Sequence, residues 1–196
     1  MLTEIPLFPL NTVLFPGGSL PLKIFEQRYM DMVKACLKDE ASFGICLIAQ
    51  GAEVGTAAKP HPVGTLARIA KWDMAQLGVL QVVVHGGGRF RVKNYRAERS
   101  GLLRGEVELL PAPEAVPLPD DADALVPLLS AVVADLGENS PPMPHRYDDA
   151  AWVANRYCEI LPIPNLARQM LLELGDPLSV LTVVRQYLAK KKLFSD

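Results

Sequence analysis

The opening of the chain constrains its fold most, because prolines repeatedly interrupt an apolar stretch there. Residues 5–29 are largely apolar and contain Pro6, Pro9, Pro16 and Pro21. Proline has a fixed φ and no backbone donor, so neither an unbroken helix nor a central strand suits this stretch. The tripeptide Pro16-Gly17-Gly18 is typical of a turn. The stretch therefore predicts two short strands joined by this turn and followed by the start of a helix.

The same stretch resembles the opening of the Lon protease N-terminal domain, also called the Lon substrate-binding domain. The matching segments are Pro6-Leu7-Phe8-Pro9, Leu14-Phe15-Pro16-Gly17, Pro21-Leu22 and Phe25-Glu26-Gln27-Arg28-Tyr29. Gly44, residues 63–66 and residues 88–90 match further family positions. The resemblance implies a β-rich pseudo-barrel similar to PUA-type domains, followed by a helical bundle. It also implies a function, the recognition of polypeptide segments.

Hydrophobic periodicity in the first 110 residues predicts one early helix among several short strands. Apolar residues recur at helical spacing over residues 25–37, which predicts a helix with one buried face. Strands are predicted over residues 42–49, 63–70, 79–85 and 89–92, with one or two more over 95–110. Residues 50–62 are small and polar and predict a loop. Gly86-Gly87-Gly88 predicts a tight turn or a bulge.

Beyond a proline-rich connection over residues 111–119, the apolar period becomes helical throughout. Four helices are predicted, and their expected start signals are Asp120-Asp121, Asp148 or Asp149, Asn165, and Asp176-Pro177. Gly175 is the expected stop of the third helix. The sequence thus predicts an α+β fold, with a PUA-like β-barrel subdomain over residues 1–112 and a bundle of about four helices over residues 120–196. Together they would form one Lon-type unit.

Composition indicates a globular chain with no strong global charge. The 196 residues are 49% hydrophobic and 21% charged, with a formal net charge of −2, so strong attraction to nucleic acid or an anionic membrane is not expected. The three cysteines form no C-x-x-C motif and are expected to be buried free thiols. No signal-peptide pattern and no apolar run of about 20 residues occurs. We expect a soluble cytoplasmic protein that does not bind membranes.

Motifs for catalysis, metals and cofactors are missing from the sequence. It contains no G-x-x-x-x-G-K-[ST] loop for ATP phosphates, no G-x-S-x-G nucleophile motif and no metal-ligand spacing. We therefore expect no catalytic residues, no cofactor and no metal. The resemblance then implies a recognition domain without the ATPase and serine-lysine peptidase modules of Lon, which acts on unfolded or apolar protein segments, and it suggests a link to protein quality control.

The candidate recognition surface is taken from the residues around the family motifs. It comprises Phe15, Phe25, Glu26, Arg28, Tyr29, Arg89, Phe90 and Arg91. We expect most of the aromatic side chains to be core, with one or two lining an apolar groove where the barrel meets the helices. Glu26 and Arg28 are expected not to face each other, with Glu26 supporting the helix N-terminus and Arg28 anchoring the sheet or a nearby carbonyl. Strand alternation predicts that Arg89 and Arg91 point outward.

Two alternative functions follow from other features. Six basic residues lie between Arg89 and Arg104, opposed there only by Glu98, and a basic strip on a PUA-like barrel is compatible with RNA binding. The other alternative is a scaffold that docks on another protein or serves a separate peptidase as an accessory. The sequence indicates neither the oligomeric state nor the partner.

Overall fold

The computed structural model describes residues 2–122, 124–137 and 140–191. The outermost residues of the two predicted subdomains, residue 1 and residues 192–196, thus lie outside the described ranges. The six strands are β1 (Leu2–Leu10), β2 (Ser19–Ile24), β3 (Phe43–Gln50), β4 (Lys59–Gln76), β5 (Val79–Ala97) and β6 (Leu103–Leu109). The helices are α1 (Gln27–Lys38), α2 (Leu125–Asp135), α3 (Ala150–Ile160), α4 (Asn165–Leu174) and α5 (Pro177–Lys190). The predicted α+β class is confirmed.

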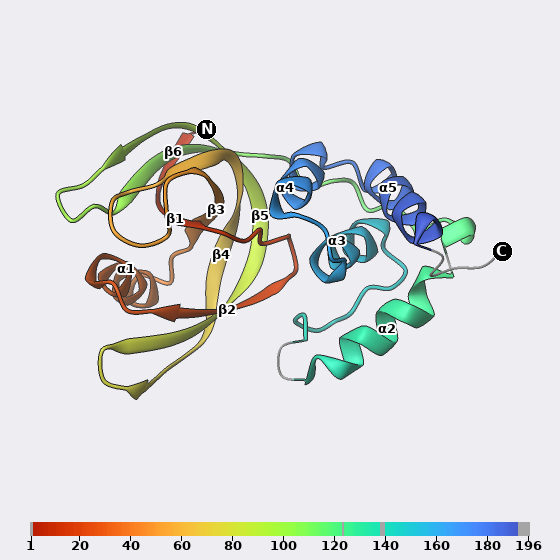
Figure 1. The fold of residues 1–196 in the computed structure, drawn as a ribbon, viewed down its shortest axis with the longest axis horizontal. Coiled ribbons are helices and arrows are strands. Elements are labelled where there is room, and N and C mark those ends of the chain that lie inside the picture. The colour runs from red at the N-terminus through yellow and green to blue at the C-terminus, as the bar shows by residue number, and fades with distance from the viewer. Residues whose placement is uncertain (1, 123, 138–139, 192–196) are drawn as a thin grey trace.

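The six strands form one sheet that closes on itself. Its order is β2-β5-β4-β3-β1-β6, and β5 also pairs with β6. Closure depends on the length of β5, which pairs with β2 over its first part and with β6 over its second part. Figure 1 shows this barrel on the left, with α1 against it and the β4–β5 hairpin extending away from it.

The barrel core is built from the apolar face of α1 and the strands that face it. Phe8 of β1 stacks on Tyr29 of α1 with 3.9 Å between the ring centroids. Met32 and Val33, one helical turn further along α1, and Cys36, two turns further, are buried in the same cluster. Since aromatic rings and branched side chains bury large apolar areas, this cluster explains why the early helix folds onto the barrel rather than onto the later helices.

The glycine run in β5 is a bulge rather than a turn. Thr65 of β4 lies opposite Arg89, and Ala67 lies opposite Gly86, so one extra residue is inserted in β5 between them. The strand continues through the bulge, so the predicted bulge is confirmed and the alternative, a tight turn between two strands, is wrong. The predicted loop over residues 50–62 is also too long, because β4 begins at Lys59 and carries two prolines where its register against β3 is irregular.

The helical part begins and ends its helices largely at the predicted signals. Asp149 caps α3 by accepting hydrogen bonds from the backbone of Ala151 and Trp152. Asp176 caps α5, and Gly175 ends α4 with a left-handed φ of 66°. Asn165 is not a cap, because Pro164 occupies that position and Asn165 is the first residue of α4. Asp120 and Asp121 belong to a short 3-10 turn that precedes α2.

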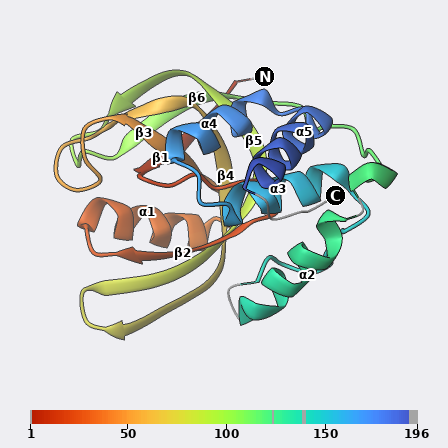
Figure 2. The ribbon, with the colours of Figure 1, turned by 45° about the vertical axis from the view of Figure 1, so that its right-hand side comes forward.

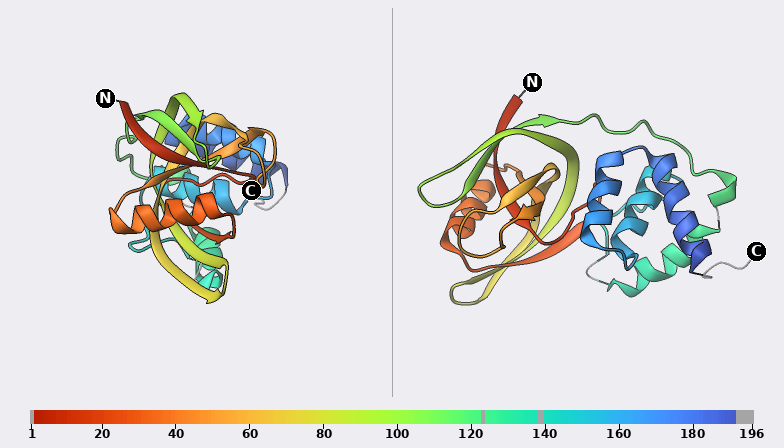
Figure 3. Two further views of the ribbon diagram at one scale, coloured as in Figure 1. Left: turned by 90° about the vertical axis from the view of Figure 1, so that its left-hand side faces the viewer. Right: turned by 45° about the horizontal axis from the view of Figure 1, so that its top comes forward.

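The barrel and the helices share one hydrophobic core. Val13, Phe15, Leu47 and Val63 come from the barrel side and belong to a buried cluster with residues of α2, α3, α4 and α5. Figures 1 and 2 show α3 and α4 next to the barrel and α2 further out, and in Figure 1 α5 lies on the far side of α3 and α4. The right-hand view of Figure 3 shows the extended connection after β6 running from the barrel to the far side of the helices. The first 110 residues and the helical part therefore pack directly against each other through this cluster.

Two further features of the described residues bear on function. None of their helices combines the length and apolarity needed to cross a bilayer. No three metal-ligating side chains among them lie close enough to hold an ion.

Candidate functional site

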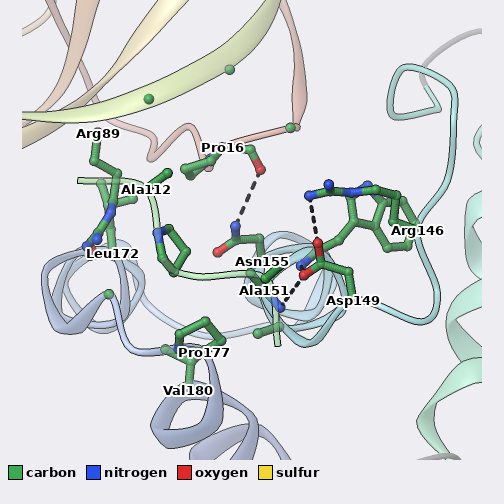
Figure 4. A pocket seen from close by; sticks show the side chains of 18 of the residues that line it. Pro16, Arg89, Ala112, Arg146, Asp149, Ala151, Asn155, Leu172, Pro177 and Val180 are labelled. Carbon is green, nitrogen blue, oxygen red and sulfur yellow. Dashed lines mark hydrogen bonds and ion pairs between the residues drawn. The ribbon is translucent and has the colours of Figure 1, made fainter. Parts of the chain in front are cut away.

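A cleft lies where the barrel meets the helices and the connecting segment. Its volume is about 430 Å³, within the range of ligand pockets. One wall is the bulged part of β5 at residues 86–89, and the opposite walls come from residues 112–115 and from the ends of α3, α4 and α5. Figure 4 shows the connecting segment passing between the barrel strand and the helices. Most lining residues are glycine, alanine or proline, so the main chain itself forms much of the surface.

The polar groups of this cleft are largely engaged within the protein. Arg89 donates a hydrogen bond from Nη1 to the carbonyl oxygen of Leu172 at 2.9 Å, and burial followed by the nearby Arg91 lowers the pKa of its guanidinium. Arg146 pairs with Asp149 at 2.7 Å. Including Glu114, the lining carries two cationic and two anionic side chains. The cleft is therefore formally neutral and has no strong preference for a charged ligand.

An ion pair between the buried Arg156 and the partly exposed Glu159 holds the Pro-Gly-Gly turn against α3 beside this cleft. Arg156 is 1% exposed and bonds to both carboxylate oxygens of Glu159, at 2.7 and 2.9 Å. Its Nη2 also donates to the carbonyl oxygen of Pro16 at 3.0 Å. A Cβ on Gly18 would collide with the Glu159 carboxylate. The turn thus lies directly against the ion pair, and a side chain at position 18 would have to displace the Glu159 carboxylate.

A second groove, between α4 and α5, is almost entirely apolar. Its volume is about 410 Å³. It is lined by Leu161, Ile163, Ala167, Met170, Leu171, Leu174, Val183, Val184 and Tyr187. Met170 is 66% exposed, Leu174 is 50% exposed and Val183 is 42% exposed. Contiguous exposed apolar side chains of this kind mark interaction surfaces in folded proteins.

Sequence reasoning did not identify the α4–α5 groove. Only the start and stop of this helix were predicted from the sequence, and α4 carries apolar residues on more than one side. Leu172 is buried, whereas Leu166, Met170 and Leu174 are exposed. The recurrence of apolar residues at positions 166, 170 and 174, four apart, is the signal that could have found the groove, because such positions share a helix face.

The eight candidate recognition residues do not form one surface. Phe15 and Phe90 are 1% and 0% exposed and belong to the core. Arg89, predicted to point outward from the barrel, lines the junction cleft and is covered by α4 instead of solvent, because its guanidinium bonds to Leu172 of that helix. Phe25 lies 57% exposed, although the helical pattern placed it on the buried face of a helix, since α1 begins only at Gln27. Arg91 is exposed on the barrel.

Glu26 and Arg28 contact each other, which corrects the prediction for this pair. The Arg28 guanidinium lies 2.9 Å from the Glu26 carboxylate, and its Nη1 donates to the carbonyl oxygen of Gly101 at 2.9 Å. Glu26 precedes the helix with an extended backbone, φ −78° and ψ 133°, so helical spacing does not apply to it. The Glu26 side chain makes no capping hydrogen bond. The pair links the start of α1 to the β5–β6 turn.

The basic strip is largely neutralised by the protein itself. Lys93 pairs with Glu108 at 2.6 Å, Arg104 pairs with Glu98 at 2.8 Å, and Arg96 pairs with Glu4. The Arg96 hydrogen bond lowers the pKa of the Glu4 carboxyl, and the Lys93 hydrogen bond does the same for Glu108. With Arg89 bonded to a backbone carbonyl, four of the six basic residues between positions 89 and 104 have internal partners.

These features define a small α+β module in which a closed barrel and four helices share a buried hydrophobic cluster and carry the two grooves described above. The family profile described as the ATP-dependent protease La (LON) substrate-binding domain matches residues 4–190. The chain belongs to this family.

Individual relatives agree with the family assignment. A crystal structure of a Lon N-terminal domain protein from Xanthomonas campestris superposes with a TM-score of 0.76 at 35% identity, covering 95% of this chain and 98% of that one. The N-terminal domain of Mycobacterium avium complex Lon protease superposes with a TM-score of 0.67 at 18% identity and shares the fold. Lon protease of Anaeromyxobacter dehalogenans is 31% identical over 144 residues, 71% of this chain but 17% of that protein.

A different kind of protein carries a similar segment. Protein cereblon of Danio rerio is 29% identical over 126 residues, 62% of this chain and 28% of that protein. The chain thus spans under a third of the length of either curated relative.

Proposed function

We propose that this protein is a non-catalytic recognition module that binds apolar segments of unfolded polypeptides through the α4–α5 groove. The family is that of a substrate-binding domain, which supports a recognition role. Its clients would be proteins that expose hydrophobic segments, as in protein quality control. The predicted groove at the junction of barrel and helices is less suited to this role, because small and polar residues line much of it.

The observation that carries the proposal is the exposed apolar lining of the α4–α5 groove. Met170 and Leu174 from α4 face Val183 from α5 across it. Methionine is unbranched and adapts its shape to different partners, which suits a site that accepts many client sequences. An amphipathic or extended apolar segment could remove this surface from water, and each buried side chain of that size would contribute about 1.5–3 kcal/mol before entropic costs.

The proposal is tested by titrating the protein into fluorescently labelled, reduced and carboxymethylated α-lactalbumin, which stays unfolded. Saturable binding is expected at protein concentrations up to about 50 µM. The variant Val183→Lys places a charge in the groove and should weaken binding at least tenfold. Thr182→Lys is the matched control, because it also replaces a β-branched residue of α5 with lysine but changes an exposed residue that does not line the groove.

Three results would count against the proposal. They are a lack of saturable binding, equal binding by the Val183→Lys variant and the native protein, and equal weakening by both lysine variants. RNA binding remains the competing function and makes a different prediction, a steep fall in affinity with salt. The internal pairing of Lys93, Arg96 and Arg104 favours the polypeptide, because cations already paired release few counterions on binding.

A further inference from the structure

The β4–β5 hairpin carries a free sheet edge where it leaves the barrel. β3 pairs with β4 only as far as the pair of Phe43 with Ala67, whereas β5 pairs with β4 as far as Gln76. Among the strands that the structure describes, residues 68–76 of β4 therefore have a neighbour on one side only. In Figures 1 and 2 the hairpin projects below β2, away from the helical part.

The main chain along this edge is open to a partner. Within the described ranges, the backbone hydrogen bonds outside the strand ladders do not involve residues 68–76. The N–H of Met74 donates to the Asp73 carboxylate of its own strand at 2.8 Å. Unpaired N–H and C=O groups on an edge strand are a template for pairing with another chain.

Exposed apolar and charged side chains alternate along the same edge. Trp72 is 58% exposed and Met74 is 39% exposed. Lys71 and Asp73 are exposed as well, and the ion pairs found among the described residues include neither of them. Because side chains alternate between the two faces of a strand, Trp72 lies on one face and both charges lie on the other.

The two charges are placed symmetrically about Trp72. In an antiparallel pairing of two identical strands centred on Trp72, a two-fold axis passes through that residue, and Lys71 of each copy lies opposite Asp73 of the other. Residues 71–73 pair in continuous register with residues 81–83 of β5, so this segment has the regular pleat that such pairing requires. The free edge is therefore complementary in charge to a second copy of itself.

We propose that two copies of this protein associate through the free edge of β4, in an antiparallel pairing centred on Trp72. The indole rings of the two copies face each other on one side of the joined sheet. Two ion pairs form on the other side, each between Lys71 of one copy and Asp73 of the second. Cross-strand pairs of aromatic residues and of opposite charges both stabilise a sheet.

The shape of the edge limits the strength of this association. The register of β4 against β5 shifts between Ile69 and Lys71 and again between Asp73 and Gln76. Because such irregularities bend and twist an edge strand, the ladder between the copies is confined to a few residues around Trp72. An interface of that size lies below the roughly 1,200 Å² of stable complexes. We therefore expect a reversible dimer with a Kd of about 10–100 µM.

This surface is separate from the site of the proposed function. None of residues 68–76 lines the α4–α5 groove, so the inference does not depend on what that groove binds. Charge reversal at the edge should accordingly leave the affinity for unfolded α-lactalbumin unchanged.

The experiment measures self-association of the full chain by sedimentation equilibrium at protein concentrations from about 5 to 500 µM, which bracket the expected Kd. Lys71→Glu places a glutamate opposite Asp73, and Asp73→Lys places a lysine opposite Lys71. Each variant should weaken self-association at least about tenfold, because like charges directly opposite each other repel. Lys59→Glu is the matched control, because it makes the same change at an exposed residue of β4 that already pairs with β3.

Mixing the two charge variants gives the sharpest result. In a mixed dimer Glu at position 71 lies opposite Lys at position 73, and the native Asp73 of the first copy lies opposite the native Lys71 of the second. The mixture should therefore dimerise with a Kd within about threefold of the native value, although neither variant does so alone. Thermal unfolding of each variant confirms that it is folded.

Four outcomes would overturn the inference. They are a native protein that stays monomeric over the whole range, native self-association in both charge variants, equal weakening by Lys59→Glu, and a mixture that does not dimerise. Self-association that is lost in Val183→Lys would also overturn it, because that result would place the contact at the α4–α5 groove.

Discussion

Arg156 of α3 donates a hydrogen bond from Nη2 to the carbonyl oxygen of Pro16, 3.0 Å away, and so ties the helical part to the turn between β1 and β2. The same guanidinium is bonded to Glu159. This buried cation thus adds to the hydrogen bond from Asn155 to Pro16 and to the shared hydrophobic cluster in holding the proline-rich opening against the third helix.

Removing this cation should destabilise the whole protein. Arg156→Ala leaves the Glu159 carboxylate and the Pro16 carbonyl without their shared donor, and breaking a buried ion pair typically costs about 3–5 kcal/mol. Urea unfolding followed by fluorescence of Trp152, which packs next to Arg156, measures the loss. Arg185→Ala is the control, since Arg185 pairs with Asp121 at the surface and such pairs contribute about 0–1 kcal/mol. Similar losses in both variants would contradict the assigned role of Arg156.

The same substitution should change the free energy of unfolding strongly at one glycine of the barrel wall and hardly at all at another. A Cβ on Gly64 would lie 2.7 Å from the sulfur of Cys46 and would also collide with the backbone of Ile45, whereas a Cβ on Gly88 meets no atom within 4 Å. We expect Gly64→Ala to lower the free energy of unfolding by about 1–3 kcal/mol through overpacking. Gly88→Ala should change it by less than about 0.5 kcal/mol. Urea unfolding curves test this, and a large loss in Gly88→Ala would show that the cleft is not open at that point.

Phe15 and Phe25 should differ sharply although both lie in the motif stretch. Phe15 is 1% exposed in the shared core and Phe25 is 57% exposed. Phe15→Ala should cost about 3–5 kcal/mol of stability, as expected for a large core cavity. Phe25→Ala should cost less than about 0.5 kcal/mol. The melting temperatures of the two variants decide this, and comparable decreases would contradict the placement of Phe25 outside the core.

Stability should fall at alkaline pH because two thiols are buried in protonated form. Burial raises the pKa of Cys46 to about 12. Burial is also the main cause that raises the pKa of Cys158 to about 12. The thiol of an unfolded cysteine has a pKa near 8.5. The folded state therefore keeps protons that the unfolded chain releases, so the free energy of unfolding decreases as pH rises above about 8.5. At pH 9.5 each thiol contributes a loss of about 1 kcal/mol.

Urea unfolding at pH 7 and pH 9.5 measures this effect. Cys46→Ala serves as the comparison, because it removes one of the two thiols whose pKa burial raises to about 12 and should reduce the difference between the two pH values. A difference that is unchanged in this variant, or a native protein that is more stable at pH 9.5, would contradict the assignment of buried, protonated thiols.

Local signals in the sequence were sufficient for the class of fold. The switch from strand-like to helical periodicity near Pro111 separates the barrel from the helices, and Asp149, Gly175 and Asp176 act as the helix signals they resemble. These signals could be read because each depends on the backbone conformation of one or two residues.

The candidate site was less predictable because it depends on contacts between distant segments. Arg89 is covered by α4 and bonds to Leu172, 83 residues further along the chain, and no strand pattern contains the information that a helix lies there. The junction cleft lies beside the part of β5 where the partner strand changes from β2 to β6. The α4–α5 groove required knowledge of which apolar face of α4 the barrel covers.

The most direct test of client recognition uses methyl NMR of protein labelled at its methionine methyl groups. Three exposed methionines report on three surfaces: Met74 on the β4–β5 hairpin, Met143 in the segment before α3, and Met170 in the α4–α5 groove. On titration with unlabelled, unfolded α-lactalbumin, the account predicts that the Met170 resonance shifts saturably while those of Met74 and Met143 stay in place. A shift confined to Met74 or Met143, with Met170 unmoved at saturation, would contradict it.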